Sequence, residues 1–249
     1  LQSGSSRCLL YHIIFAFSKG DKAGIILAMK RFLKFIIGLA LLPACYGYSL
    51  EFLRVISAIY KNPGTYWGMF VGGGAVYLLL HILLPKPLLL HIFGHELTHA
   101  FFAKLFGWKV KSMKATNSGG HVKLSGSNFI VTLAPYFFPL YSFIVLLIYM
   151  MTILFGYDKG FYPYFLFLTG FTISLHILMT IESLRTDQPD IKEGGLVFSA
   201  PLIYLGNILV MVLLLRLTVF KDINYYGFLK MGWLRSWEVW KALYNAGSG

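Results

Sequence analysis

The sequence predicts an all-α polytopic membrane protein with about six transmembrane helices, on the evidence of its composition, its long apolar runs and the placement of its basic residues. Of the 249 residues, 57% are hydrophobic and 13% are charged. In soluble proteins, roughly 45–50% of residues are hydrophobic and about 25% are charged. Lys and Arg gather at the ends of the apolar runs, where they suit lipid headgroups. The net charge of +12 therefore indicates a lipid bilayer as the partner, and no nucleic-acid-binding motif is present.

Apolar runs that approach or exceed the roughly 20 residues of a membrane-spanning helix define the predicted membrane domain. No internal repeat relates them. The predicted spans are 32–50, 66–84, 87–106, 129–154, 161–181 and 196–220.

Two flanking segments complete the expected organisation. Residues 1–31 form an N-terminal interfacial segment, because the apolar stretch 8–17 is too short to span. The membrane domain follows at 32–220. Residues 221–249 are predicted to form an interfacial amphipathic helix, since its aromatic side chains share one helical face beside basic residues. Those aromatic residues are Trp233, Trp237, Trp240 and Tyr244. Residues 1–6 and 246–249 are interpreted as vector-derived sequence.

His95, Glu96 and His99 form the HExxH motif of zinc metalloproteases within the third predicted span. Residues four apart share a helical face, so the two histidines can bind one Zn²⁺ while Glu96 acts as general base towards zinc-bound water. A carboxylate inside an apolar helix is costly unless it is paired or coordinated. This favours a functional site over two core histidines beside a chance glutamate. With Pro87 as the first helical residue, helix rise places His95 about 12 Å into the bilayer region. A protein-lined cavity must therefore admit water.

His91 lies one helical turn before His95 but cannot join the same ion. His91 and His99 are eight residues apart, which separates them by about 12 Å along a helix, too far for both to bind one tetrahedral metal ion. We expect His91 to line the entrance or to pack nearby. The spacing of His91, His95 and His99 also resembles a histidine box of membrane di-iron oxidases, but the seven scattered histidines do not form the further boxes of such a site.

The third ligand is predicted to come from the polar segment 185–195, between two apolar spans. A catalytic zinc takes three protein ligands and keeps one position open. A proline and a glycine pair in this segment allow a non-helical chain to turn inward. Asp190 is the predicted ligand. Asp187, His176 and His121 are the alternatives.

A short extended strand is predicted after the third span. The stretch 118–124 combines a glycine pair with alternating side chains, and the neighbouring lysines make it an unusual loop under the positive-inside rule. We expect it to fold back into the site as a re-entrant β-like segment. Gly119, Gly120 and His121 would then form a substrate-docking edge, because glycine lets another backbone approach closely.

These motifs resemble the site-2 protease family of intramembrane zinc metalloproteases. The resemblance covers residues 87–220 and rests on the HExxH motif in an apolar helix, the following Gly119-Gly120-His121, and an aspartate before a glycine pair. It implies a helical core around a buried zinc, with one ion per chain held by the two histidines and an aspartate, and with Glu96 as catalytic base.

The chain resembles a divergent member of that family. Asp190 is separated from the glycine pair by Ile191-Lys192-Glu193, and Ala134-Pro135-Tyr136 stands where the family has a Gly-Pro turn.

The expected function is hydrolysis of peptide bonds in membrane-embedded protein substrates by a zinc metalloendopeptidase. The expected location is a bacterial-type cytoplasmic membrane, which the chain crosses several times. The alternative is a non-catalytic membrane metal transporter or scaffold, which needs metal ligands but no general base.

Overall fold

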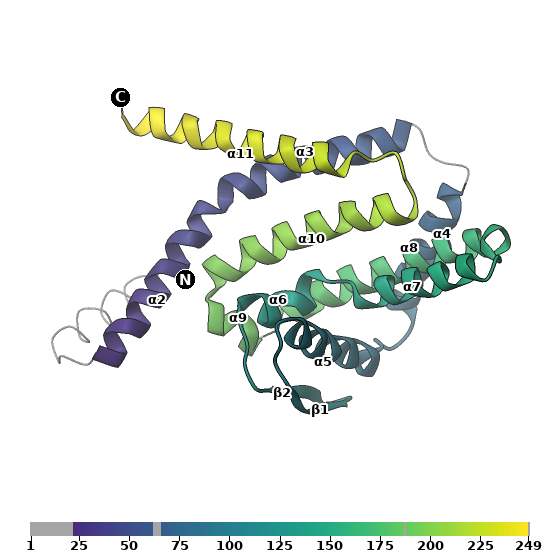
Figure 1. The fold of residues 1–249 in the computed structure, drawn as a ribbon, viewed down its shortest axis with the longest axis horizontal. Helices are drawn as coiled ribbons and strands as arrows, with labels where there is room; N and C mark the ends of the chain where they lie inside the picture. The colour runs from purple at the N-terminus through teal and green to yellow at the C-terminus, as the bar shows by residue number, and fades with distance from the viewer. Residues whose placement is uncertain (1–21, 62–65, 187, 249) are drawn as a thin grey trace.

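The computed structural model describes residues 22–61, 66–186 and 188–248, which form a helical protein with one β-hairpin (Figure 1). The apolar stretch 8–17, the segment 1–6 and the candidate ligand Asp187 lie outside the described residues. In chain order the elements are α2 (Lys22–Ala40), α3 (Leu42–Lys61), α4 (Trp67–Leu83), α5 (Leu88–Leu105), β1 (Val110–Thr116), β2 (Gly119–Leu124), α6 (Phe129–Phe137), α7 (Leu140–Leu154), α8 (Asp158–Leu184), α9 (Pro189–Gly194), α10 (Leu196–Thr218) and α11 (Tyr225–Gly247).

Two helices are long and apolar enough to cross a membrane: Gly160–Leu184 within α8, and α10. The consecutive helices α6 and α7 form a third candidate, bent by 75° at the break between them. Within the described part of the chain, α4 is apolar but shorter, and α5 is not among the candidates. The structure is therefore consistent with a mostly helical membrane protein, with two or three helices long and apolar enough to cross the bilayer, and the number six stays a prediction.

The first predicted span, 32–50, is wrong as a single helix. The chain turns at Leu41, and the predicted span takes in the end of α2 and the start of α3. Pro43 explains the break, because it lacks the N–H that would continue the helix across this point but is tolerated in the first turn of a new one. Beyond residue 50, α3 continues to Lys61 and carries the buried Glu51, which accepts hydrogen bonds from Arg54 and Arg235.

The predicted C-terminal helix is present as α11, which packs against α3. Its buried face consists of Phe228, Gly232 and Ser236. Contact is close, since a side chain at Gly232 would collide with the ring of Tyr48. The aromatic side chains predicted to share one face are exposed, and their contact with a membrane interface stays a prediction. They are Trp233, Trp237, Trp240 and Tyr244.

The hairpin and the helix that carries the HExxH motif form one unit. Gly107, with a φ of +78°, ends α5 in the left-handed conformation that favours glycine. Strands β1 and β2 then pair antiparallel, and both pack against α5. On its other side α5 contacts α6. The extended segment expected at 118–124 corresponds to β2, and it lies beside the HExxH residues.

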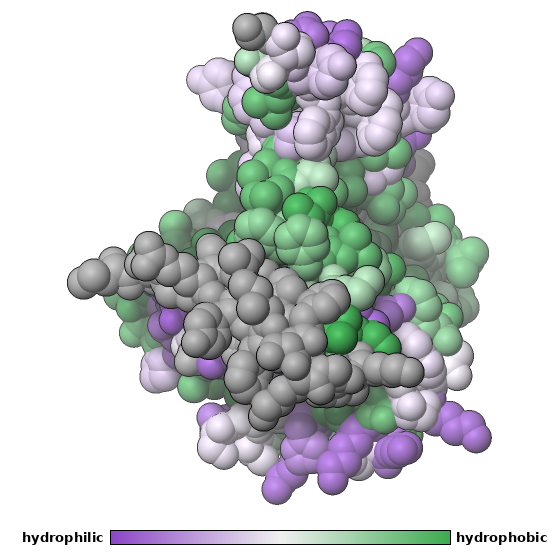
Figure 2. Space-filling model, turned by 90° about the vertical axis from the view of Figure 1, so that its left-hand side faces the viewer, coloured by the Kyte–Doolittle hydropathy of each residue, from purple (hydrophilic) through white to green (hydrophobic). Residues whose placement is uncertain are grey.

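The remaining helices form two groups. α8 packs with α4 and α7, whereas α10 packs with α2, α3, α6 and the short helix α9. Figure 2 shows a hydrophobic band across the middle of one face, with hydrophilic side chains at its upper and lower ends. Figure 1 places α11 at the upper end and the hairpin at the lower end.

Candidate metal centre

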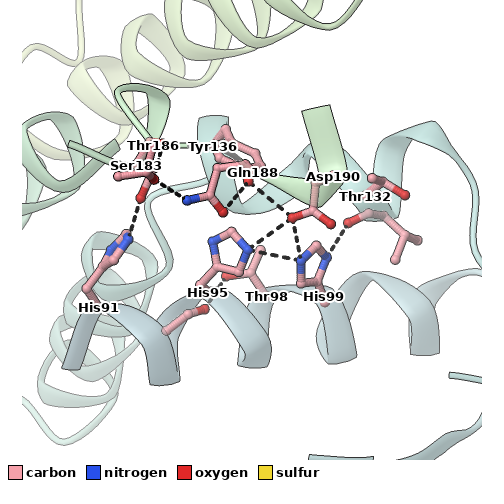
Figure 3. Close-up of polar contacts among 12 residues, drawn as sticks. His91, His95, Thr98, His99, Thr132, Tyr136, Ser183, Thr186, Gln188 and Asp190 are labelled. Atoms are coloured by element: carbon pink, nitrogen blue, oxygen red, sulfur yellow. Dashed lines mark hydrogen bonds and ion pairs between the residues drawn. The ribbon is translucent and has the colours of Figure 1, made fainter. Parts of the chain in front are cut away.

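His95, His99 and Asp190 converge at the junction of α5 and α9 (Figure 3). The Nε2 atoms of the two histidines are 3.1 Å apart. Asp190 Oδ2 lies 3.3 Å from His95 Nε2 and 3.4 Å from His99 Nε2. In the part of the chain that the structure describes, this is the group of His, Cys, Asp and Glu side chains whose ligand atoms lie close enough together to hold a metal ion.

The three spacings match what a tetrahedral zinc site requires. Zinc–nitrogen and zinc–oxygen bonds are about 2.0–2.1 Å long, which puts neighbouring ligand atoms of a tetrahedron about 3.3 Å apart. The observed separations of 3.1, 3.3 and 3.4 Å are close to this expected distance. Two imidazoles and one carboxylate are also a ligand set of catalytic zinc sites with an open fourth position. The residues present therefore fit a zinc ion.

The orientation of His99 is set by a proline on another helix. Pro135 lies within α6 and has no N–H to donate to the carbonyl of Val131, four residues earlier. His99 Nδ1 donates to that carbonyl at 2.8 Å. A histidine that carries its proton on Nδ1 presents an unprotonated Nε2 to the ion, as metal-binding histidines generally do.

Asp190 is positioned by α9 and by Tyr136. Pro189 occupies the first turn of α9, where its fixed φ suits helix initiation. The hydroxyl of the buried Tyr136 donates to Asp190 Oδ2 at 3.1 Å. Burial by itself raises the pKa of Asp190, but its contacts with the imidazoles of His95 and His99 outweigh burial and hold the pKa well below its usual range. The carboxylate is thus ionised, as a metal ligand must be.

Glu96 is buried beside the hairpin, with a relative exposure of 8%. A Cβ atom built on Gly120 would lie 2.9 Å from Glu96 Oε1 and 2.6 Å from Ile92 Cγ2. The absence of a side chain at Gly120 is therefore what lets β2 lie directly against the carboxylate of Glu96.

Two cavities open on either side of this carboxylate. One, of about 610 Å³, extends past His91 and Gly119, and the other, of about 550 Å³, extends past His99 and His121. Both are lined by His95, Glu96, Gly120, Gln188 and Pro189. The site therefore has room for water and for an extended segment alongside β2.

The other candidates have separate partners. His91 Nε2 lies 2.8 Å from Ser183 Oγ at the end of α8, and His176 Nε2 lies 3.2 Å from Asn207 Oδ1 on α10. His121 lines the cavity beside Glu96 but is not part of the converging group. The structure thus brings together the two motif histidines and Asp190.

Sequence reasoning missed the residues that hold the ligands in place, namely Tyr136 and the pair of Val131 and Pro135. The available signal was a proline next to a tyrosine inside an apolar run. A proline there leaves a carbonyl without its helical partner, which predicts a hydrogen-bond donor from elsewhere in the chain.

No family model, no curated protein and no solved structure matches this chain.

Proposed function

We propose that this protein is a zinc metalloendopeptidase of the site-2 protease type that cleaves membrane-embedded protein substrates. The observation that carries the proposal is the convergence of His95, His99 and Asp190 with zinc-compatible spacing, next to a buried glutamate and two open cavities. A purely structural metal site would be closed by a fourth protein ligand. Here the described residues supply three ligand atoms.

The chain's own residues have distinct roles in the proposed reaction. A bound zinc would lower the pKa of water towards 7 and polarise a carbonyl group. Glu96 takes up the proton of the attacking water and delivers it to the leaving amine, a contribution of roughly 10²- to 10⁴-fold in rate. Asp190, as an ionised carboxylate ligand, would partly offset the positive charge of the ion. The Val131 carbonyl keeps His99 in its metal-binding tautomer.

The membrane substrate is supported by an apolar cavity of about 910 Å³ between the two candidate spanning helices, α8 and α10. This cavity and the one past His91 share Thr186 and Gln188 in their linings. A substrate segment that left the bilayer between α8 and α10 would therefore reach the proposed metal site at His95, His99 and Asp190. There it would have to unwind and could lie in an extended form along Gly119–His121, since a helix hides its peptide bonds. The multi-pass, six-span arrangement in a bacterial-type cytoplasmic membrane belongs to the same proposal.

The test compares cells that express the wild type with cells that express Glu96→Gln, from which each protein is then purified. Bound zinc is measured by elemental analysis, and fragments of co-expressed membrane proteins are identified by proteomics. We expect one zinc per chain in both proteins and fragments only in the wild type. Cleavage that continues undiminished in Glu96→Gln would exclude the protease mechanism. Zinc binding without any cleavage in either protein would instead support a metal transporter or scaffold.

A further inference from the structure

The hairpin carries a concentration of unpaired positive charge. Lys104, Lys109, Lys111, Lys114 and Lys123 lie on it or directly before it, and all are exposed. No Asp or Glu occurs between residues 97 and 157. By contrast, Lys86, which precedes α5, forms a 2.7 Å ion pair with Glu182, and Arg235 pairs with Glu51. Among the described residues, none of the five hairpin-region lysines has an ion pair.

The strand register places lysines together on the outer face of the hairpin. Lys114 lies opposite His121, and Ser112 lies opposite Lys123. Lys114 and Lys123 are therefore diagonal neighbours on one face, with their α-carbons about 7–8 Å apart. Side chains alternate along a strand, so Gly120 points to the other face, against Glu96 and α5. Like charges at this spacing repel one another unless an anion lies between them.

Apolar and aromatic side chains border this basic face. Phe106 and Trp108 stack with their ring centroids 5.6 Å apart at the end of α5. Leu105 is 65% exposed and Phe106 is 45% exposed. In Figure 2 the hydrophilic lower end of the molecule directly adjoins the hydrophobic band. Lysines beside exposed aromatic and aliphatic residues are typical of the headgroup region of a bilayer.

We propose that the outer face of the hairpin, which carries Lys114 and Lys123, together with Lys111 at the register irregularity next to Ser112, binds the phosphate groups of anionic phospholipids. The occupant is lipid because the same molecule carries helices long and apolar enough to span a bilayer, with exposed apolar side chains beside the lysines. The inner face of the same hairpin contacts Glu96 through Gly120. Anionic lipid on the outer face therefore holds β2 against the catalytic base, which links lipid composition to the site.

The experiment measures lipid binding and does not depend on metal or cleavage. The full chain in detergent is titrated with short-chain phosphatidylglycerol, and bound lipid is counted by native mass spectrometry. Phosphatidylcholine of the same chain length is the neutral control. Each lysine near an anionic surface contributes roughly 5-fold in affinity, so Lys111→Gln/Lys114→Gln/Lys123→Gln should weaken phosphatidylglycerol binding by at least about 10-fold.

Two matched variants serve as controls. Lys61→Gln/Lys230→Gln/Lys241→Gln removes the same charge from exposed positions on α3 and α11 and should weaken phosphatidylglycerol binding clearly less than the hairpin variant does. Arg at all three hairpin positions should restore binding. Amide exchange at Gly120 and Val122 should slow on adding phosphatidylglycerol in the wild type and not in the Gln variant.

The proposal is overturned if the wild type binds phosphatidylglycerol no better than phosphatidylcholine. It is also overturned if both triple-Gln variants lose affinity equally. Competition by soluble glycerol phosphate as effective as that by the lipid would identify a site for free anions instead. Because no readout involves zinc or proteolysis, failure of the proposed function would leave these outcomes unchanged.

Discussion

His99 donates from Nδ1 to the carbonyl of Val131 across 2.8 Å, and this hydrogen bond joins α5, the helix of the HExxH motif, to the bent segment formed by α6 and α7. The carbonyl is available because Pro135 supplies no N–H to it. A backbone feature of one helix thereby determines which nitrogen of His99, on another helix, faces Asp190 and the proposed metal site.

Pro135→Ala should weaken zinc binding by about 10-fold, the lower end of the effect of losing a supporting hydrogen bond to a ligand. The new N–H at position 135 would compete with His99 for the Val131 carbonyl. Zinc affinity is measured by competition with a chromophoric chelator, and cobalt substitution reports changes in coordination. Pro163→Ala, which changes a proline within α8, is the control and should bind zinc normally. Equal affinities in both variants would show that the proline does not orient His99.

Tyr136→Phe removes the hydroxyl that donates to Asp190 at 3.1 Å and should reduce zinc affinity or turnover by about 10- to 100-fold. Helix packing should change little, because the ring is retained. The matched control is Tyr141→Phe, which loses a hydroxyl bonded to the carbonyl of Leu90 and not to a ligand. Similar losses in the two variants would point to a general effect on folding.

Asp190→Ala should abolish stoichiometric zinc binding and cleavage, since it removes one of the three converging ligand atoms. Asp187→Ala and His176→Phe should retain zinc. His176 is bonded to Asn207 and lies outside the converging group. Elemental analysis after gel filtration gives the stoichiometry. Loss of zinc in His176→Phe, with Asp190→Ala still loaded, would reverse the assignment of the third ligand.

Gly120→Ala should reduce cleavage sharply while zinc stays bound, because the added methyl group would lie within 3 Å of both Ile92 and Glu96. The same methyl group would displace the carboxylate of Glu96, the proposed catalytic base, so a substitution at Gly120 does not test substrate docking alone.

Removing the obstructing atom should separate these two effects. The double variant Gly120→Ala/Ile92→Ala should recover part of the lost activity if crowding is the cause. Substrate docking is tested independently by a photoreactive residue at position 121, which should cross-link to the transmembrane segment of a substrate. Absence of cross-links there would remove the hairpin edge from the docking proposal.

Much of the candidate site follows from local spacing. His95 and His99 share a helical face whatever the rest of the chain does, because a separation of four residues is close to one helical turn. The apolar composition likewise required a membrane, since a chain with so few charged residues has too little polar surface for water. The extended strand beside the site could also be predicted, because glycines and alternating side chains are local signals.

Only the tertiary structure decided which remote groups complete the site. Asp190 and His176 were both plausible ligands by residue type, and the choice between them depends on where α9 and α8 pack relative to α5. The same holds for Tyr136 and for the carbonyl freed by Pro135, whose partner is another helix. The turn at Leu41 shows a second limit of sequence reasoning. The apolar run around it is continuous and predicts one helix, but the backbone turns within the run. Short-range periodicity thus determined the two histidines and their helix, whereas the third ligand and its supports arose from contacts between segments far apart in the chain, which periodicity does not encode.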